Sequence, residues 1–324
     1  MYTLLEAQNL VEKHIQSLNI PDTPPELYEP VRYILSLGGK RIRPALVILA
    51  CDMFAGDVAS ALIPAVAIEI FHNFTLLHDD IMDRSERRRG SPTVHVKYNE
   101  NVAILSGDVM SILASRLMNQ APGAVLNVVH EVYTHTAMQV CEGQQMDMNF
   151  EELLSVTEEE YLSMIELKTA VLIAASLKIG AILGGSSQRD AEDLYEFGRN
   201  LGIAFQLQDD LLDTYGDPAV MGKNLGTDIV DNKKTFLVIQ ALETASSTQK
   251  EDLMGWLKEE DKDPKEKINA VTAIFNALKV KKITEKRILD YYQQALTNLK
   301  NLNRPEERKT ELYNFASFLM NRNR

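Results

Sequence analysis

The chain is poor in cysteine, glycine and proline, and it has no surplus of basic residues. Its 324 residues include two cysteines, 16 glycines and 11 prolines. Cys51 and Cys141 stand apart in apolar surroundings and cannot form a zinc site by themselves, so we expect both to be reduced core residues. There are 34 Lys and Arg against 46 Asp and Glu, a net charge of −12. This balance argues against a general nucleic-acid or membrane-surface binder.

The sequence also shows no secretory signal and no clear membrane span. Its first residues, MYTLLEAQNLVEKHIQ, carry Glu6 and Glu12 and lack a basic start, an apolar core and a cleavage site. This pattern predicts a cytoplasmic protein. The most apolar window, residues 169–185, has Lys178 in its middle. We therefore expect a buried helix there and no membrane span.

Helical periodicity is what the sequence has in abundance. No stretch shows sustained alternation with period two, and the breaks carry turn residues, as in SLGGKR, GSPTVH and YGDPAV. No Pro- or Gly-rich linker divides the chain, so we expect one all-α domain over residues 1–324, a single large bundle of roughly a dozen helices. The expected helices are 3–18, 27–37, 43–55, 58–83, 99–119, 122–148, 158–182, 189–215, 233–245, 248–257, 265–278, 284–302 and 305–321.

The segment LLHDDIMDRSERRRG holds a first cluster of acidic residues. Asp79 and Asp83 are four positions apart, so their carboxylates project from one face of a helix, with Asp80 beside them. Carboxylates this close repel one another unless a cation neutralises them, and hard divalent ions such as Mg²⁺ accept carboxylate oxygens. Taken alone, the cluster is more simply explained as a solvated acidic turn balanced by the nearby arginines.

A second segment, QLQDDLLDTYGD, repeats the same DD-x-x-D pattern with Asp209, Asp210 and Asp213. Both clusters end long helices with apolar periodicity. Two such helices facing each other would enclose a central cavity lined by carboxylates. That arrangement predicts a cage for several Mg²⁺ ions that hold a polyanion, best explained as a diphosphate, because carboxylates alone would repel it.

Basic residues gather at two places near the first cluster. Arg88 and Arg89 follow it in RRRGSP. The segment GGKRIRP adds three cations close to the start of a helix, where Pro44 suits the first turn: Lys40, Arg41 and Arg43. A Gly-Gly pair is also an ordinary helix stop, and GGK lacks the spacing of a phosphate-binding P-loop.

Together these segments resemble the trans-isoprenyl diphosphate synthase (polyprenyl synthetase) family, short-chain type. The resemblance covers about 200 residues in the order of the family. It is carried by GGKRIRP, FHNFTLLHDDIMDRSERRRGSPTVH, the GD of LSGDVM, GQQMD, LKTA, FQLQDDLLDTYGD, GKNLGTDI and DNKKTF. It implies the isoprenoid-synthase type of helical bundle around a central cavity, and a homodimer.

The resemblance also implies roles for individual residues. The metal ligands would be Asp79, Asp80, Asp83, Asp209, Asp210 and Asp213, holding three Mg²⁺, with Mn²⁺ as an alternative. The allylic diphosphate would be held by Arg88, Lys168, Thr169, Gln206, Lys223 and Lys233. The metal-free pocket for isopentenyl diphosphate would be formed by Lys40, Arg43, His72 and Arg89. Without the motif, a lone histidine such as His72 is usually a core residue.

The implied reaction is ionisation of the allylic diphosphate, condensation with isopentenyl diphosphate and elimination of a proton. Thr169 and Gln206 would face the carbocation, and no side chain needs to act as a nucleophile. Electrostatic stabilisation and exclusion of water would carry the catalysis.

The first cluster's helix is also expected to set product length. Thr75 lies one turn before Asp79, with Phe74 beside it and Phe71 a turn deeper. In the family, an aromatic residue five positions before the first aspartate, with no insertion inside the motif, is typical of C20 synthases. We therefore expect geranylgeranyl diphosphate as product, with farnesyl diphosphate next, although Phe74 could instead pack against a neighbouring helix.

Several alternatives stay open. The chain could be a longer-chain polyprenyl diphosphate synthase or a non-catalytic subunit of a heteromeric prenyltransferase. A terpene cyclase or a squalene-type synthase would not need both the second cluster and the GGKRIRP pocket. The basic C-terminus, FLMNRNR, could close over the site or be a solvated tail, which we favour.

Overall fold

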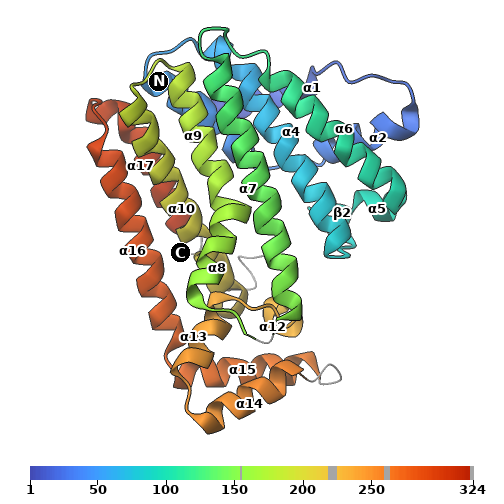
Figure 1. Ribbon diagram of the computed structural model, residues 1–324, viewed down its shortest axis with the longest axis vertical. Coiled ribbons are helices and arrows are strands. Elements are labelled where there is room, and N and C mark those ends of the chain that lie inside the picture. Colours follow the sequence, from blue (N-terminus) through green and yellow to red (C-terminus); the bar gives the residue numbers. More distant parts are fainter. Residues whose placement is uncertain (154, 218–224, 259–262, 322–324) are drawn as a thin grey trace. The chain divides into compact units, whose positions relative to one another are not determined.

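The computed structural model describes residues 1–153, 155–217, 225–258 and 263–321 (Figure 1). The chain forms two compact units. Unit 1 comprises Met1–Thr136, Ala175–Tyr195 and Leu302–Leu312, and unit 2 comprises Ala137–Ala174, Glu196–Asn301 and Tyr313–Arg324. The units are described separately below.

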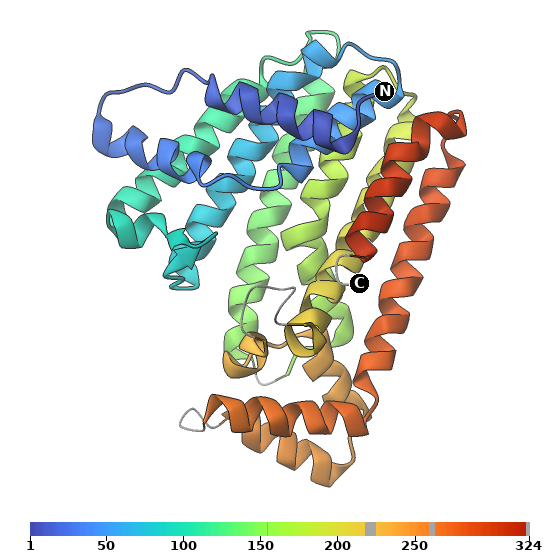
Figure 2. The same cartoon turned by 180° about the vertical axis from the view of Figure 1, so that it is seen from behind.

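Unit 1 is built mainly from the first helices of the chain. They are α1 (Leu4–Gln16), α2 (Pro25–Ser36), α3 (Ile42–Met53), α4 (Val58–Met82), α5 (Val94–Lys97) and α6 (Glu100–Met118). A hairpin of β1 (Arg87–Arg88) and β2 (Ser91–Pro92) lies between α4 and α5. Helix α4 packs side by side with α6 and contacts α3, and α1 covers α3 (Figures 1 and 2).

Unit 2 is built mainly from helices of the second half of the chain. They are α8 (Glu158–Ile165), the π-helical turn η1 (Glu166–Ala170), α12 (Thr227–Val230), α13 (Phe236–Thr244), α14 (Ser247–Lys258), α15 (Pro264–Ala277) and α16 (Val280–Asn301). Helices α14 and α15 lie side by side, and α13 packs on α8, α15 and α16 (Figure 1). Four helices contribute residues to both units: α7 (Leu126–Glu152), α9 (Val171–Leu183), α10 (Gln188–Tyr215) and α17 (Glu306–Met320).

Helix α4 is the central helix of unit 1. It begins at Asp57, whose carboxylate accepts a hydrogen bond from the N–H of Ala59 at 3.0 Å. Its residues 65–71 are buried without a break because apolar side chains occur on every face. On length and composition alone, α4 and α6 could each cross a membrane, and 61% of the most apolar window of α4 is buried against 33% in α6. Burial on all faces is what a core helix shows.

The predicted all-α fold is confirmed, and the helix boundaries agree within a few residues at most positions. One predicted helix, 158–182, is wrong as a continuous α-helix, because η1 interrupts it between α8 and α9. The sequence analysis also missed the hairpin, α5 and α12, which are too short to show a period. That the chain is one domain stays a prediction.

The prediction for the cysteines is half wrong. Cys51 is buried in α3, whereas Cys141 on α7 is exposed. The buried face of α7 runs through Val129, Tyr133 and Val140, and Cys141 is rotated about 100° from Val140 on the helix. An apolar neighbour in sequence therefore did not place Cys141 in the core.

Candidate active site

The first aspartate cluster closes helix α4. Asp79 and Asp80 lie in its last turn, and Asp83 is the C-cap residue. Asp80 is buried, and both of its carboxylate oxygens accept hydrogen bonds from Arg88 Nε, at 2.8 and 2.9 Å. Arg88 Nη2 also lies 3.6 Å from Asp79 Oδ2. Burial raises the pKa of the Asp80 carboxyl, and Arg88 opposes that rise.

The position of these carboxylates is electrostatically unfavourable in itself. The C-terminus of a helix carries partial negative charge. Three carboxylates placed there are therefore repelled by that partial charge and by one another. Arg88 lies 2.8 Å from Asp80 and 3.6 Å from Asp79. Three carboxylates at this end of α4 favour the binding of a cation.

The hairpin places two arginines in different directions. Its two-residue turn, Arg89–Gly90, has φ angles of 52° and 80°, as in the type I′ turn that suits the twist of paired strands. Arg88 turns toward the carboxylates of α4. Arg89 instead lies against Gly39, where a Cβ atom would be only 2.8 Å from Arg89 Nη2. Glycine at position 39 therefore permits the close approach of the Arg89 guanidinium.

The side chains of Arg43 and His72 are in contact in unit 1. Arg43 Nη1 lies 3.0 Å from His72 Nε2. A guanidinium can only donate, so His72 Nε2 is the acceptor and the imidazole is neutral with its proton on Nδ1. Burial lowers the pKa of His72 well below its ordinary value, and the charges of Arg43, Arg89 and Arg88 lower it further. The structure thus brings these predicted residues close together.

The charge and the hydrogen-bonding state of Arg43 favour the binding of an anion. Burial lowers its pKa to about 10, so it keeps its charge at neutral pH. Its Nε atom is buried and has no hydrogen-bond acceptor among the described residues. A buried donor without an acceptor is unfavourable, and an anionic oxygen would satisfy it.

Arg41 and Lys40 behave differently from Arg43. Arg41 is buried and donates hydrogen bonds to Glu12 at 2.7 Å, to Glu69 at 2.6 Å and to the carbonyl of Leu35 at 2.8 Å. Its φ of 45° turns the chain into α3. Arg41 therefore supports the loop, and Lys40 is the exposed residue before it.

The second aspartate cluster lies near the end of α10 in unit 2. Asp210 is buried, with Oδ2 accepting a hydrogen bond from the hydroxyl of Tyr161 and Oδ1 accepting one from Gln206 Nε2 at 3.2 Å. Burial raises the pKa of Asp210 to about 7, and the neighbouring charges of Asp228 and Asp209 act in the same direction. Asp209 itself is only half-buried.

Asp213 holds the start of α12. Its Oδ1 accepts a hydrogen bond from the Thr227 hydroxyl at 2.6 Å, and its Oδ2 accepts one from the N–H of Asp228 at 3.0 Å. Like Asp80 and Asp210, it is buried and engaged by groups of the protein itself. The structure thus distinguishes these three carboxylates from the half-buried Asp79 and Asp209. The role of each as a metal ligand stays a prediction.

The π-helical turn η1 carries Lys168 and Thr169. Lys168 Nζ lies 2.6 Å from Asp147 Oδ2 on α7, and the Thr169 hydroxyl donates to Gln206 Oε1 at 3.3 Å. Gln206 in turn reaches Asp210. Single π-turns inside α-helices are frequent at functional sites.

Two glycines allow neighbouring helices to approach η1. A Cβ atom at Gly143 of α7 would lie 2.3 Å from the backbone nitrogen of Lys168, and one at Gly202 of α10 would lie 2.6 Å from Cα of Ala170. Both contacts are with backbone, which cannot move aside as a flexible side chain could. The π-turn is therefore packed tightly on both helices.

The structure gives fewer contacts for the two remaining predicted lysines, Lys233 and Lys223. Lys233 Nζ lies 3.9 Å from Asp228 Oδ1, and its side chain is half exposed. Lys223 lies outside the residues that the structure describes.

The predicted floor residues belong to an aromatic group in unit 1. The ring centroids of Phe71 and Phe74 are 5.5 Å apart, and Phe71 meets Tyr133 of α7 edge-on at 5.6 Å. Thr75 donates from its hydroxyl to the carbonyl of His72 at 2.8 Å. His78 contacts Phe74 and reaches the carbonyl of Ile104 on α6 with Nε2 at 3.1 Å, as befits a structural residue.

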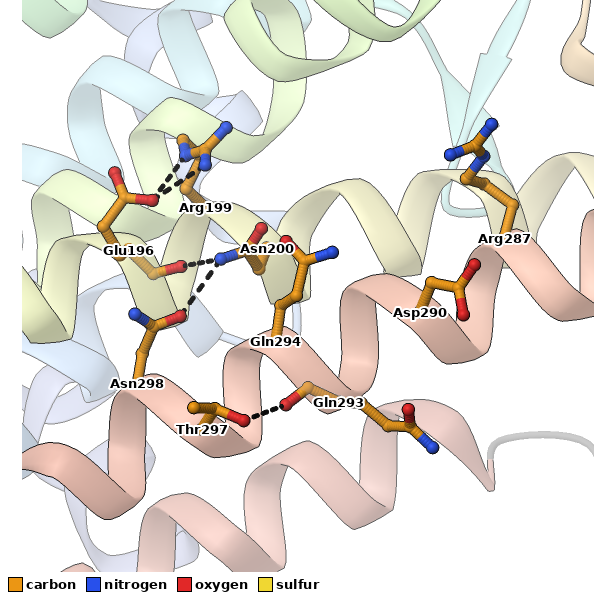
Figure 3. Close-up of a pocket in the computed structure, with 9 residues that line it drawn as sticks. All are labelled: Glu196, Arg199, Asn200, Arg287, Asp290, Gln293, Gln294, Thr297 and Asn298. Atoms are coloured by element: carbon orange, nitrogen blue, oxygen red, sulfur yellow. Dashed lines mark hydrogen bonds and ion pairs between the residues drawn. The ribbon is translucent and has the colours of Figure 1, made fainter.

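A groove of about 550 Å³ in unit 2 lies apart from all the predicted residues (Figure 3). Its lining comes from α10 and α16: Glu196, Arg199, Asn200, Arg287, Asp290, Gln293, Gln294, Thr297 and Asn298. Arg199 pairs with Glu196 and Glu166, and Arg287 pairs with Glu158. Small-molecule sites are lined mostly by apolar side chains, whereas all nine side chains that line this groove are polar or charged.

The carboxylates fit a hard divalent ion. Within the described ranges, no three acidic, histidine or cysteine side chains come together as a complete metal site. The half-buried Asp79 in unit 1 and the half-buried Asp209 in unit 2 nonetheless each offer an oxygen ligand of the kind that Mg²⁺ prefers.

The sequence analysis missed several partners of the predicted residues. Tyr161, which holds Asp210, gave no signal, because a tyrosine 49 residues away cannot be paired by pattern. Asp147 lay within the motif GQQMD without an assigned role, and Tyr133 on α7 carried no signal for its contact with Phe71.

Comparison with known proteins shows the family of the chain. The polyprenyl synthetase family profile matches residues 24–274. Geranylgeranyl diphosphate synthase of Methanosarcina mazei is 47% identical over 235 residues, 72% of each chain. Short chain isoprenyl diphosphate synthase of Methanothermobacter thermautotrophicus is 38% identical over 99% of this chain and 98% of its own. A crystal structure of geranylgeranyl pyrophosphate synthase, 40% identical, superposes with a TM-score of 0.95 over all of both chains. The chain belongs to the polyprenyl synthetase family.

Proposed function

We propose that the protein is a geranylgeranyl diphosphate synthase, which condenses isopentenyl diphosphate with an allylic diphosphate to give an all-trans C20 product. The observation that supports this function is that the chain has two chemically different kinds of anion site. The half-buried Asp79 at the end of α4 in unit 1, and the half-buried Asp209 near the end of α10 in unit 2, each offer the oxygen ligands that suit a metal-bound diphosphate. Arg43, Arg89 and neutral His72 suit a diphosphate held by cations alone.

The residues of the chain would share the chemistry as follows. Three Mg²⁺, when bound, would neutralise the leaving diphosphate. Arg88, Lys168 and Lys233 would hold its remaining oxygens and so favour departure of the allylic group. Thr169 and Gln206 would face the carbocation with oxygen atoms that stabilise positive charge without trapping it.

The second substrate would be oriented by its own pocket. Arg43 and Arg89 would hold isopentenyl diphosphate so that its double bond meets the cation. The proton lost in the last step would leave with the departing diphosphate, so that no catalytic base of the protein is needed. Exclusion of water would protect the cation from hydrolysis.

Product length gives the first test of this function. With Mg²⁺, isopentenyl diphosphate and a dimethylallyl, geranyl or farnesyl primer, we expect a C20 diphosphate by chromatography of the dephosphorylated products. Phe74→Ala should shift the main product to C25 or longer, because burial of each added CH₂ is worth about 0.8 kcal/mol once the aromatic obstacle is removed.

The aromatic group supplies the control for this test. Phe74 packs on Phe71, and Phe71 also contacts Tyr133, so Tyr133→Ala should lengthen the product only in combination with Phe74→Ala. An unchanged C20 product from Phe74→Ala would mean that the ring only packs against its neighbours. Products of C30 or longer from the unaltered enzyme would favour a longer-chain synthase.

We also propose that the protein is a cytoplasmic homodimer that joins through α6. This helix exposes three large apolar side chains on one face: Ile104 at 45%, Leu105 at 58% and Ile112 at 67% exposure. An apolar face on a helix of this length is typical of an interface between protein chains, and a second copy is the partner that the family resemblance implies.

The dimer has a direct test. Sedimentation velocity at micromolar concentration should give twice the monomer mass, and Ile112→Glu should give monomers, because a charge on each copy would meet its symmetry mate. Glu100→Gln on the same helix is the control and should leave the dimer intact. A monomeric wild type would refute the proposal.

A further inference from the structure

Helix α12 is a single turn that lies just before Lys233, one of the proposed diphosphate-binding residues. It spans Thr227–Val230, includes Asp228 and is followed by Lys233. Four residues form too few internal hydrogen bonds to hold a helix in water. The turn must therefore be fixed from outside.

The start of α12 is fixed by α10. The Asp213 carboxylate accepts hydrogen bonds from the Thr227 hydroxyl and the N–H of Asp228. The carbonyl of Asp213 also accepts a hydrogen bond from the N–H of Gly226 at 2.6 Å. A residue of the aspartate cluster thus sets where the turn begins.

The end of α12 forms a Schellman motif. The N–H of Lys233 donates to the carbonyl of Asp228 at 2.9 Å, and the N–H of Asn232 donates to the carbonyl of Ile229 at 3.3 Å. Asn232 takes the left-handed conformation that this motif requires, with φ of 56°. The direction in which Lys233 leaves the turn thus depends on the backbone conformation of Asn232.

Lys267 of α15 holds that end in place. The residue is only 4% exposed, and its Nζ donates to Asn232 Oδ1 at 2.6 Å and to the carbonyl of Val230 at 3.1 Å. An ammonium suits the carbonyls at a helix C-terminus. The next residue, Ile268, packs so closely that a Cβ atom at Gly226 would lie 2.7 Å from its side chain.

The burial of the charged Lys267 side chain requires a physical explanation. Burying an ammonium is unfavourable unless it is well paired, and an apolar side chain of the same length would fill the space without that penalty. Two oxygens at the end of α12 belong to that pairing. Since one belongs to the left-handed residue and the other to the last turn of the helix, a single side chain fixes both.

We propose that Lys267 is a positioning residue for prenyl transfer. It holds the end of α12 so that Lys233 meets the allylic diphosphate, and it does not touch the substrate itself. This role rests on the proposed function of Lys233. The same ammonium that caps the turn thereby sets affinity for one of the two substrates.

The test is Lys267→Met, which keeps the length of the side chain and removes the charge. We expect the KM for the allylic diphosphate to rise, and the kcat/KM for it to fall by about 10- to 100-fold, as for other residues that orient site groups. The KM for isopentenyl diphosphate should stay within about twofold. Lys309→Met is the matched control, because Lys309 is 2% exposed and paired with Glu306 in unit 1. It should lower the Tm and leave both KM values unchanged.

A second readout does not depend on activity. Hydrogen exchange of the amides of Asn232 and Lys233 should quicken in Lys267→Met and not in Lys309→Met. If Lys267→Met lowers only the Tm, with the allylic KM and this exchange unchanged, the positioning role is wrong. If the unaltered enzyme forms no prenyl diphosphate from any primer, the proposed function fails, while the exchange result still decides whether Lys267 fixes the turn.

Discussion

Asp79→Asn is expected to lower kcat/KM by about 10²- to 10³-fold, the usual loss when one electrostatic group of a charge-stabilising site is removed. The free energy of unfolding should change little. Asp79 is half-buried at the C-terminus of α4, where Asp80 and the helix dipole repel its charge while Arg88 Nη2, 3.6 Å away, attracts it. Removing that charge relieves the repulsion and loses the attraction, so the two effects oppose each other. Steady-state kinetics at saturating Mg²⁺ and urea unfolding in EDTA would measure the two effects.

Asp80→Asn provides the contrast within the same cluster. Asp80 is 2% exposed, and its carboxylate is held by Arg88. Its replacement should lower the free energy of unfolding by roughly 3 kcal/mol, the lower end for a broken buried pair, because a quarter of the Arg88 side chain remains exposed. Equal losses of stability in the two variants would mean that the cluster is only structural. Unchanged kinetics in Asp79→Asn would remove it from the site.

Much of the fold followed from periodicity because most helices are long and bury a stripe of apolar residues. The ends of α4 and α10 were predictable since each aspartate cluster follows such a stripe. Elements of two to five residues were not predictable, because α5, α12, η1 and the hairpin are too short for an apolar period to repeat. Their conformations come from tertiary contacts, such as the caps that Asp213 and Lys267 provide for α12.

Some features of the candidate site could likewise be predicted from the sequence, and others could not. Sequence could identify the residues of each motif because their chemistry is local, with carboxylates four positions apart and arginines in adjacent positions. It could not show which carboxylates are already occupied by the protein. Asp80 is engaged by Arg88 eight residues away, while Asp210 is engaged by Tyr161 at a separation of 49 residues. A repeated DD-x-x-D therefore conceals unequal roles that only the fold reveals.

Helix η1 shows how a short irregular element can depend on residues far away in sequence. A regular α-helix would place Lys168 and Thr169 differently, and the extra residue of the π-turn redirects both toward Asp147 and Gln206. The contact on α7 is possible only because position 143 has no side chain.

Gly143→Ala is therefore expected to reduce kcat/KM by about 10²-fold, since a displacement of about 1 Å at a reacting group is enough for such a loss. Two effects on stability oppose each other. Alanine favours the helix by about 1 kcal/mol, but its Cβ would lie 2.3 Å from the backbone of Lys168, and overpacking of this kind costs about 1–3 kcal/mol. The clash should prevail because backbone cannot rotate away. Urea unfolding and steady-state kinetics would measure both consequences.

Gly255→Ala is the matched control, because Gly255 also lies in a helix of unit 2 and a Cβ atom there would meet nothing within 4 Å. It should raise the free energy of unfolding by about 0.5–1 kcal/mol and leave the kinetics unchanged. If Gly143→Ala behaved like Gly255→Ala, α7 could move away from η1 without consequence, and the π-turn would not need that support. Opposite signs of stability change in the two variants would instead show that the close packing of α7 keeps Lys168 where the allylic diphosphate requires it.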